Sequence, residues 1–112
     1  MKSVSAVIRP TKLDDVIEAL SAVGVKAFTT TEVKGFGQQK GHAQAYRGAE
    51  CEVTFVPRIQ IDAAISDNLL GKVIEAIGRA AKTGKIGDGK VFVSVLEHAV
   101  RVRTGETNEA AL

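Results

Sequence analysis

The 112-residue sequence lacks the features expected of a membrane protein, a disulfide-stabilised secreted domain or a general nucleic-acid binder. It has one cysteine, Cys51, which cannot form an intramolecular disulfide and therefore favours a reducing compartment. No run approaches the roughly 20 apolar residues of a membrane span, and residues 1–10 carry no signal-peptide pattern. A formal net charge of +2 gives no overall case for nucleic acid. We expect a cytoplasmic protein that reaches a membrane only through a partner.

The remaining composition is that of an ordinary folded domain. Apolar residues make up 45% of the chain and charged residues 25%, as is usual for globular proteins. The length suggests one domain over residues 1–112. Alternating apolar and polar residues predict strands at 3–9 and 53–62. β-Branched residues predict a long strand at 25–36, and we expect another strand at 91–96.

Helical spacing of apolar residues predicts one helix in each half of the chain. We expect Thr11 and Ser66 to cap the starts of these helices, and Gly24 and Gly84 to end them. The apolar positions with this spacing are Leu13, Val16, Ile17 and Leu20 in the first helix and Leu70, Val73, Ile74 and Ile77 in the second.

A short internal repeat supports two similar halves. The string VIEAL at 16–20 recurs as VIEAI at 73–77. It could be a generic helix string, but the surrounding element order repeats too, which favours two βαβ halves. The predicted fold class is α+β, a ferredoxin-like βαββαβ sandwich. Its helices cover one sheet face, and the other face, which we expect to be apolar, needs a cover that self-association usually provides.

A glycine-rich loop between the second helix and the last strand is the sharpest local signal. Its glycines let backbone amides approach an anion, and its lysines supply positive charge. Although residues 84–90 fit G-x-x-x-x-G-K, Val91 replaces the magnesium-binding Ser or Thr and the loop leads into a strand, so this is not a Walker A loop. A flexible turn with solvated lysines is the alternative. The residues concerned are Lys82, Gly84, Lys85, Gly87, Gly89 and Lys90.

Two arginines near the C-terminus strengthen the case for a phosphate site. If residues 100–103 (VRVR) are extended, Arg101 and Arg103 share one face. Planar, always charged guanidinium groups suit phosphate oxygens. Alone, the pair would be read as a solvated face; together with the glycine loop, it favours phosphate binding.

A long loop at 37–52 separates the two halves. Loops longer than roughly 12–15 residues are uncommon in compact domains and are usually functional or disordered, and we favour function. His42 has no second histidine nearby, so a metal site there is disfavoured. Cys51 lies between Glu50 and Glu52, which disfavours a reactive thiolate.

Three stretches resemble PII nitrogen-regulatory signal-transduction proteins. EVKGFG, QKGH and YRGAE within residues 32–50 resemble the PII strand and T-loop, and TGKIGDGKVFV at 83–93 resembles the B-loop. Residues 101–107 and the last two residues resemble the C-terminal segment. The resemblance implies one PII domain, with a T-loop at about 37–54, a B-loop at about 82–90 and a C-terminal segment at about 97–112.

The resemblance implies a homotrimer that binds ATP or ADP between subunits, and 2-oxoglutarate together with Mg-ATP. Gln39 would hold the magnesium ion. The implied nucleotide contacts are Thr29, Gly37, Gln38, Asp62, Ala64, Gly87, Asp88, Gly89, Lys90, Arg101 and Arg103. The implied 2-oxoglutarate contacts are Gln39, Lys40, Gly41, Arg58, Ile86 and Gly87.

The resemblance also implies how the signal leaves the protein. Each ligand state would stabilise a different T-loop conformation, and partners would bind some of these conformations. The implied partner is an ammonium transporter or an enzyme of nitrogen metabolism. The T-loop residues expected to meet it are Gln44, Tyr46, Arg47 and Cys51.

The sequence departs from the family at informative positions. Cys51 replaces the usual nucleotidylated tyrosine and Ala49 replaces a serine that is phosphorylated in some relatives, so we expect neither modification, uridylylation included. Gln38, Asp62 and Arg58 replace the common arginine, glutamate and lysine. These changes leave open a divergent PII-like sensor of adenine nucleotides, or of another small anion, without a 2-oxoglutarate response.

An enzyme such as a nucleotidase or phosphotransferase is a further hypothesis. A phosphate-binding loop would suit it, but no general base stands beside an attacking group. His42 and Asp88 are only nominal candidates. We therefore expect a regulator and not an enzyme.

Overall fold

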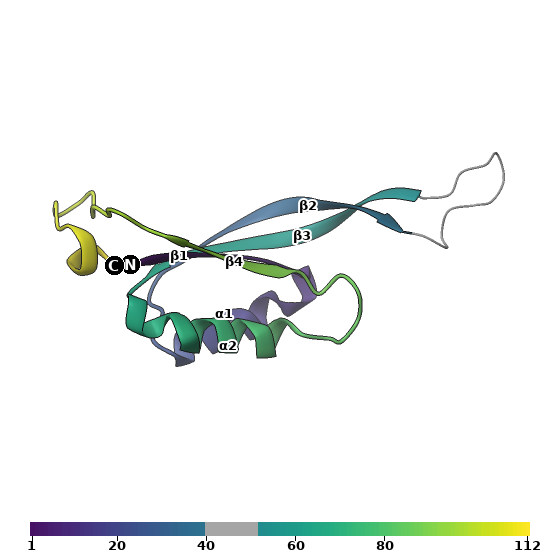
Figure 1. Ribbon diagram of the computed structural model, residues 1–112, viewed down its shortest axis with the longest axis horizontal. Helices are drawn as coiled ribbons and strands as arrows, with labels where there is room; N and C mark the ends of the chain where they lie inside the picture. Colours follow the sequence, from purple (N-terminus) through teal and green to yellow (C-terminus); the bar gives the residue numbers. More distant parts are fainter. Residues whose placement is uncertain (40–51) are drawn as a thin grey trace.

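The computed structural model describes residues 1–39 and 52–112 and confirms the predicted α+β, βαββαβ order. The strands form one antiparallel sheet in the order β2-β3-β1-β4, and both helices lie on the same face of it (Figure 1). The elements are β1 (Lys2–Ile8), α1 (Leu13–Ala22), β2 (Thr29–Gln39), β3 (Glu52–Ile65), α2 (Leu70–Ala81) and β4 (Lys90–Val95).

The core lies between the helices and the sheet. Alternation along β1 and β3 turns every second residue toward the helices, and helical spacing turns one stripe of each helix toward the sheet. Full burial of one such aliphatic side chain stabilises the fold by roughly 1.5–3 kcal/mol. Ile74, expected in this stripe, is instead 41% exposed on the outer side of α2. The largest buried side chains are Val4, Ile8, Val16, Leu20, Ile61 and Val73.

Both predicted N-caps are wrong, for different reasons. Each helix begins through a short 3-10 turn, Pro10–Lys12 before α1 and Asp67–Leu69 before α2. Thr11 therefore lies inside a turn, where it caps nothing. Ser66 makes no cap bond, and its hydroxyl donates instead to Glu109 at 2.6 Å.

The predicted helix ends are half right. Gly24 follows α1 with φ 98°, which only glycine adopts without strain, and so ends the helix as expected. α2 ends earlier than Gly84, because Lys82 is already extended at ψ 132°. The chain thus leaves α2 before the glycine loop begins, and the loop conformation is separate from the helix end.

The β2–β3 ribbon differs most from prediction. β2 begins at Thr29, not at residue 25, because Val25 is 7% exposed and its amide donates to Leu20 O at 3.0 Å. Pairing then continues to Gln39 opposite Glu52, so both ends of the predicted 37–52 loop are strands. The ribbon extends past the helices (Figure 1).

The sheet face opposite the helices is mixed, and the prediction of an apolar face is wrong. The register places polar side chains at most of its positions beside a few apolar ones such as Phe92, which is 55% exposed. A polar face of this kind can hold a charged ligand as well as a second chain. Its polar members include Ser3, Ser5, Thr29, Thr31, Gln60, Asp62, Lys90 and Ser94.

Candidate functional site

The loop at 82–90 has the backbone conformation that its glycines predict. Gly84, Gly87 and Gly89 have φ of 85°, 104° and 101°. A Cβ on Gly89 would lie 1.7 Å from Val7 O, so the loop returns to β1 too closely for any side chain at that position. Among the hydrogen bonds of the described loop, none uses the amide of Gly87 or Gly89. Two free amides in left-handed glycine turns form the kind of concave backbone surface that binds anions.

Asp88 is the centre of the loop's hydrogen-bond network. Its carboxylate accepts from the amide of Thr83 at 2.8 Å, from the amide of Gly84 at 2.9 Å and from the Thr83 hydroxyl. Arg9 Nε also donates to it at 3.0 Å. The Thr83 hydroxyl and amide, followed by Arg9 and the Gly84 amide, hold the pKa of Asp88 far below its ordinary value of 3.8.

Arg9 belongs to the hydrogen-bond network of the candidate site, which the sequence did not reveal. It immediately follows β1, and its Nη2 donates to Ile86 O at 2.8 Å while its Nε pairs with Asp88. The sequence separation is 77 residues for the first contact. The contact follows from the antiparallel register of β1 and β4, which a lone arginine before Pro10 does not indicate.

Two guanidinium groups converge at Gly87. A Cβ on Gly87 would lie 2.9 Å from Arg58 Nη2 and 3.2 Å from Arg9 Nη2. Arg58 also donates to Pro57 O at 2.9 Å. The structure therefore brings together Arg58, Ile86 and Gly87, which the sequence placed in one site, and adds Arg9 to them.

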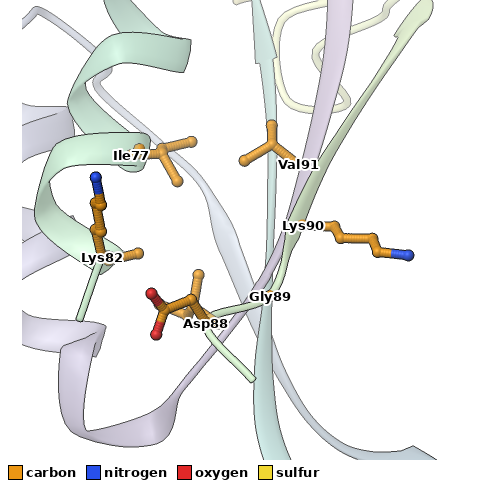
Figure 2. Close-up of a pocket in the computed structure, with 9 residues that line it drawn as sticks. Ile77, Lys82, Asp88, Gly89, Lys90 and Val91 are labelled. Carbon is orange, nitrogen blue, oxygen red and sulfur yellow. The ribbon is translucent and has the colours of Figure 1, made fainter. Parts of the chain in front are cut away.

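Other predicted residues share the sheet face opposite the helices. Thr29 is the direct cross-strand partner of Asp62, and Ala64 and Lys90 occupy positions on the same face. Gln60 donates to Asp62 at 3.1 Å. In Figure 2 the Lys90 side chain points away from the Asp88 carboxylate, which faces α2. Lys90 is thus available to a ligand on this open face, whereas Asp88 is directed toward the protein.

The predicted 2-oxoglutarate residues are not all adjacent. Gln39 pairs with Glu52, whereas Val33 pairs with Arg58 six residues farther along β3, so Gln39 and Arg58 are separated by roughly 20 Å of strand. Gly37 and Gln38 lie on the same distal part of β2. The predicted site residues Lys40, Gly41, Gln44, Tyr46, Arg47 and Cys51 fall outside the described residues.

The two C-terminal arginines are not on one extended strand, so the shared-face prediction is wrong. The chain turns at 101–105, where Gly105 N donates to Arg101 O and Arg101 N donates to Glu106 O, both at 2.8 Å. Arg101 Nε also pairs with Glu106 at 3.3 Å. This segment lies at the opposite end of the sheet from the glycine loop (Figure 1). One chain therefore cannot place Arg101 or Arg103 on a phosphate held at Gly87.

The pocket behind the loop is too small for a nucleotide. It has a volume of about 190 Å³, below the roughly 300–1,000 Å³ of ordinary ligand sites. A second pocket of about 400 Å³ lies near the C-terminal segment and includes Ala64 but neither Thr29 nor Asp62. The first pocket (Figure 2) is lined by Ile8, Ile77, Gly78, Ala81, Lys82, Asp88, Gly89, Lys90 and Val91.

The described part of the chain has neither a metal-binding cluster nor a helix that could span a membrane. Residues 1–39 and 52–112 contain no group of three His, Cys, Asp or Glu side chains arranged to hold a metal ion. No helix in these ranges has the length and apolar character to cross a bilayer.

Comparisons with known proteins agree on one family. Residues 1–106 match the family described as "Nitrogen regulatory protein P-II". The chain is 58% identical over 112 residues to "Nitrogen regulatory protein GlnK" of Escherichia coli K12, and 54% identical to "Nitrogen regulatory protein P-II" of Azospirillum brasilense. Both matches cover 100% of each chain. The solved structure of B. subtilis GlnK superposes with a TM-score of 0.85 at 35% identity, covering 99% of this chain and 97% of that one.

Proposed function

Because the chain belongs to the nitrogen regulatory protein P-II family, we propose that it is a cytoplasmic homotrimer that binds ATP or ADP between its subunits. Membership gives it a role in nitrogen-regulation signalling, and its named relatives are regulators, not enzymes. Binding of adenine nucleotides and 2-oxoglutarate is typical of the family.

The free amides of the glycine loop carry the nucleotide proposal. The amides of Gly87 and Gly89 lie in turns that glycine alone adopts easily, and the guanidinium group of Arg58 lies beside Gly87. Preformed N–H donors combined with cations are the usual way in which proteins hold polyphosphate. Lys90 adds a positive charge on the open face of the sheet.

The position of the C-terminal arginines supports a site shared between chains. Arg101 and Arg103 lie at the far end of the sheet from the loop, so they can reach its phosphates only from a neighbouring subunit. The pocket behind the loop is also too small to enclose a nucleotide in one chain. A ring of three subunits, each giving its loop to one neighbour and its C-terminal segment to the other, satisfies both observations.

Calorimetry with ADP and ATP tests the nucleotide site. The wild-type trimer should bind one nucleotide per subunit, and Lys90→Gln should weaken binding by about tenfold, because a charge-assisted contact with phosphate is lost. Arg79→Gln is the matched control, since Arg79 is 75% exposed on α2 and pairs with Glu75. Absence of binding at millimolar nucleotide, or a monomer in light scattering, would contradict the proposal.

We propose 2-oxoglutarate, bound together with Mg-ATP, as the second ligand. The guanidinium group of Arg58 lies against Gly87, which fits a ligand carboxylate. Magnesium usually takes one or two protein oxygens and completes its shell with phosphate oxygens and water. Gln39 would be a sufficient protein ligand for it, and the keto and carboxylate oxygens of 2-oxoglutarate suit the same hard ion. 2-Oxoglutarate should bind in the presence of Mg-ATP, and Gln39→Ala should abolish this dependence.

One observation favours the alternative, a sensor of adenine nucleotides without a 2-oxoglutarate response. Gln39 lies roughly 20 Å of strand from Arg58, so a site containing both requires the distal part of the ribbon to bend back. Retained ADP binding with no 2-oxoglutarate effect would support this alternative. Loss of 2-oxoglutarate binding in Arg58→Gln, with Arg79→Gln unaffected, would support the dual sensor.

We propose that the ligand state is reported through residues 37–54 to an ammonium transporter or to an enzyme of nitrogen metabolism. The expected contact residues Gln44, Tyr46, Arg47 and Cys51 would meet that partner. Retention of a partner on the immobilised trimer should differ between ATP plus 2-oxoglutarate and ADP. Cys51 lacks the phenol that accepts a nucleotidyl group, so a uridylyltransferase with UTP should leave the mass of the chain unchanged.

A further inference from the structure

The Asp88 carboxylate is already saturated by its own loop. It accepts two backbone amides, from Thr83 and Gly84, together with the Thr83 hydroxyl and Arg9 Nε. Two carboxylate oxygens offer about four acceptor positions, so these four donors use the group fully. The carboxylate also faces α2, away from the open face onto which Lys90 projects (Figure 2).

These contacts join both ends of the loop. The Thr83 and Gly84 amides belong to its start, and Asp88 belongs to its end. Arg9 connects this closed turn to β1 and, through Ile86 O, holds the segment between them at 2.8 Å. The Thr83 hydroxyl also accepts from the Lys85 amide at 3.2 Å. The network thereby fixes the segment that carries Gly87 and Gly89.

We propose that Thr83, Asp88 and Arg9 are positioning residues for the phosphate-binding amides, and that the Asp88 carboxylate does not itself contact nucleotide or magnesium. This inference rests on the proposed function. Without the network, the left-handed turns at Gly87 and Gly89 would be one of many loop conformations. The conformational entropy lost when the ligand orders the loop would then weaken binding. The geometry assigns this role, because the Asp88 carboxylate is occupied by donors of its own loop and of Arg9 and faces α2. A carboxylate placed against a phosphate would repel that phosphate.

The first test compares a ligand with phosphate to one without. ADP affinity is measured by calorimetry and adenosine affinity by ligand-observed NMR, on the full-length trimer. Thr83→Val and Arg9→Gln should each weaken ADP binding by about tenfold, because each loses a hydrogen bond to a charged partner, and should leave adenosine binding unchanged. Thr83→Ser keeps the hydroxyl and should rescue ADP binding. Arg79→Gln is the control for a surface arginine that pairs with one carboxylate.

Unchanged ADP binding in folded Thr83→Val and Arg9→Gln would overturn the inference. Equal losses for ADP and adenosine would overturn it too, because they would indicate general damage to the fold. Asp88→Asn should weaken ADP binding to the same extent with magnesium and with a chelator. A loss confined to magnesium would assign Asp88 to the metal and contradict the positioning role.

The second test needs no ligand, so it separates this inference from the proposed function. By NMR hydrogen exchange, the Thr83 and Gly84 amides of the ligand-free wild type should be protected, and Arg9→Gln should speed their exchange by about tenfold or more. Fast exchange in the wild type would show that the network does not form. A protected loop in a chain that binds no nucleotide would contradict the proposed function and leave the network standing.

Discussion

The glycine loop and the C-terminal segment both carry cationic side chains, but they hold them differently. In the loop, Asp88 accepts hydrogen bonds from its start and from Arg9, and Gly89 packs against the Val7 carbonyl too closely for any side chain. The C-terminal segment forms its own turn, and its contacts are exposed, such as that of Arg101 with Glu106. The glycine loop is held by contacts with β1 and Arg9, whereas the C-terminal segment is held mainly by contacts within the segment.

The difference bears on the proposed nucleotide site. A rigid loop can offer preformed amides to a phosphate, because no ordering is needed when the ligand arrives. The C-terminal segment has exposed contacts at the opposite end of the sheet, so a neighbouring chain can supply the rest of a site there. The proposed nucleotide site thus joins a preorganised half from one subunit to an adaptable half from the next.

The largest expected effect comes from matched glycine substitutions in the two regions. Gly89→Ala places a Cβ 1.7 Å from Val7 O at φ 101°, and we expect destabilisation by at least about 3 kcal/mol. Gly105→Ala has φ 75° and no atom within 4 Å of the added Cβ, and we expect a cost of about 1 kcal/mol. Urea unfolding at one protein concentration measures both. Equal costs would refute the contrast in packing.

The stability that Asp88 contributes should depend on pH. The folded pKa of Asp88 lies below its ordinary value of 3.8, so its ionised form contributes stability above about pH 4 and loses it as pH falls through the folded value. The stability difference between wild type and Asp88→Asn should be constant from about pH 7 to pH 5 and narrow below about pH 4. Urea unfolding at several pH values measures this difference.

Glu106→Gln is the comparison at the other end of the sheet. Loss of the exposed ion pair between Glu106 and Arg101 should change the free energy of unfolding by less than about 1 kcal/mol at neutral pH. A larger effect than that of Asp88→Asn would reverse the assignment of the rigid and adaptable regions.

The smallest expected effect tests how the C-terminal segment is attached. Ser66→Ala removes the bond from the Ser66 hydroxyl to Glu109, and we expect a loss of about 0.5–1 kcal/mol because the contact is exposed. Hydrogen exchange of residues 108–112 should rise by a few-fold, and Ser21→Ala on the surface of α1 should leave it unchanged. No change in exchange would show that this bond does not hold the segment.

The sequence predicted the element order because apolar periodicity reports which face of each element is buried. It failed at boundaries set by tertiary contacts. The amide of Val25 is bonded to the end of α1, Thr11 lies inside the 3-10 turn that precedes α1, and the hydroxyl of Ser66, at the start of the second 3-10 turn, bonds Glu109 and no helix amide. The loop glycines were evident from the sequence. The part played by Arg9 was not, because only the register of β1 and β4 brings it to Asp88.

Subunit mixing tests the division of the site between chains most directly. Lys90→Gln and Arg101→Gln trimers should each bind ADP at least about tenfold more weakly than wild type. After unfolding and joint refolding at equal amounts, about a quarter of the sites should regain wild-type affinity, because only there does an intact loop meet an intact neighbouring arginine. Mixed trimers with no recovered sites, measured by calorimetry, would contradict the account.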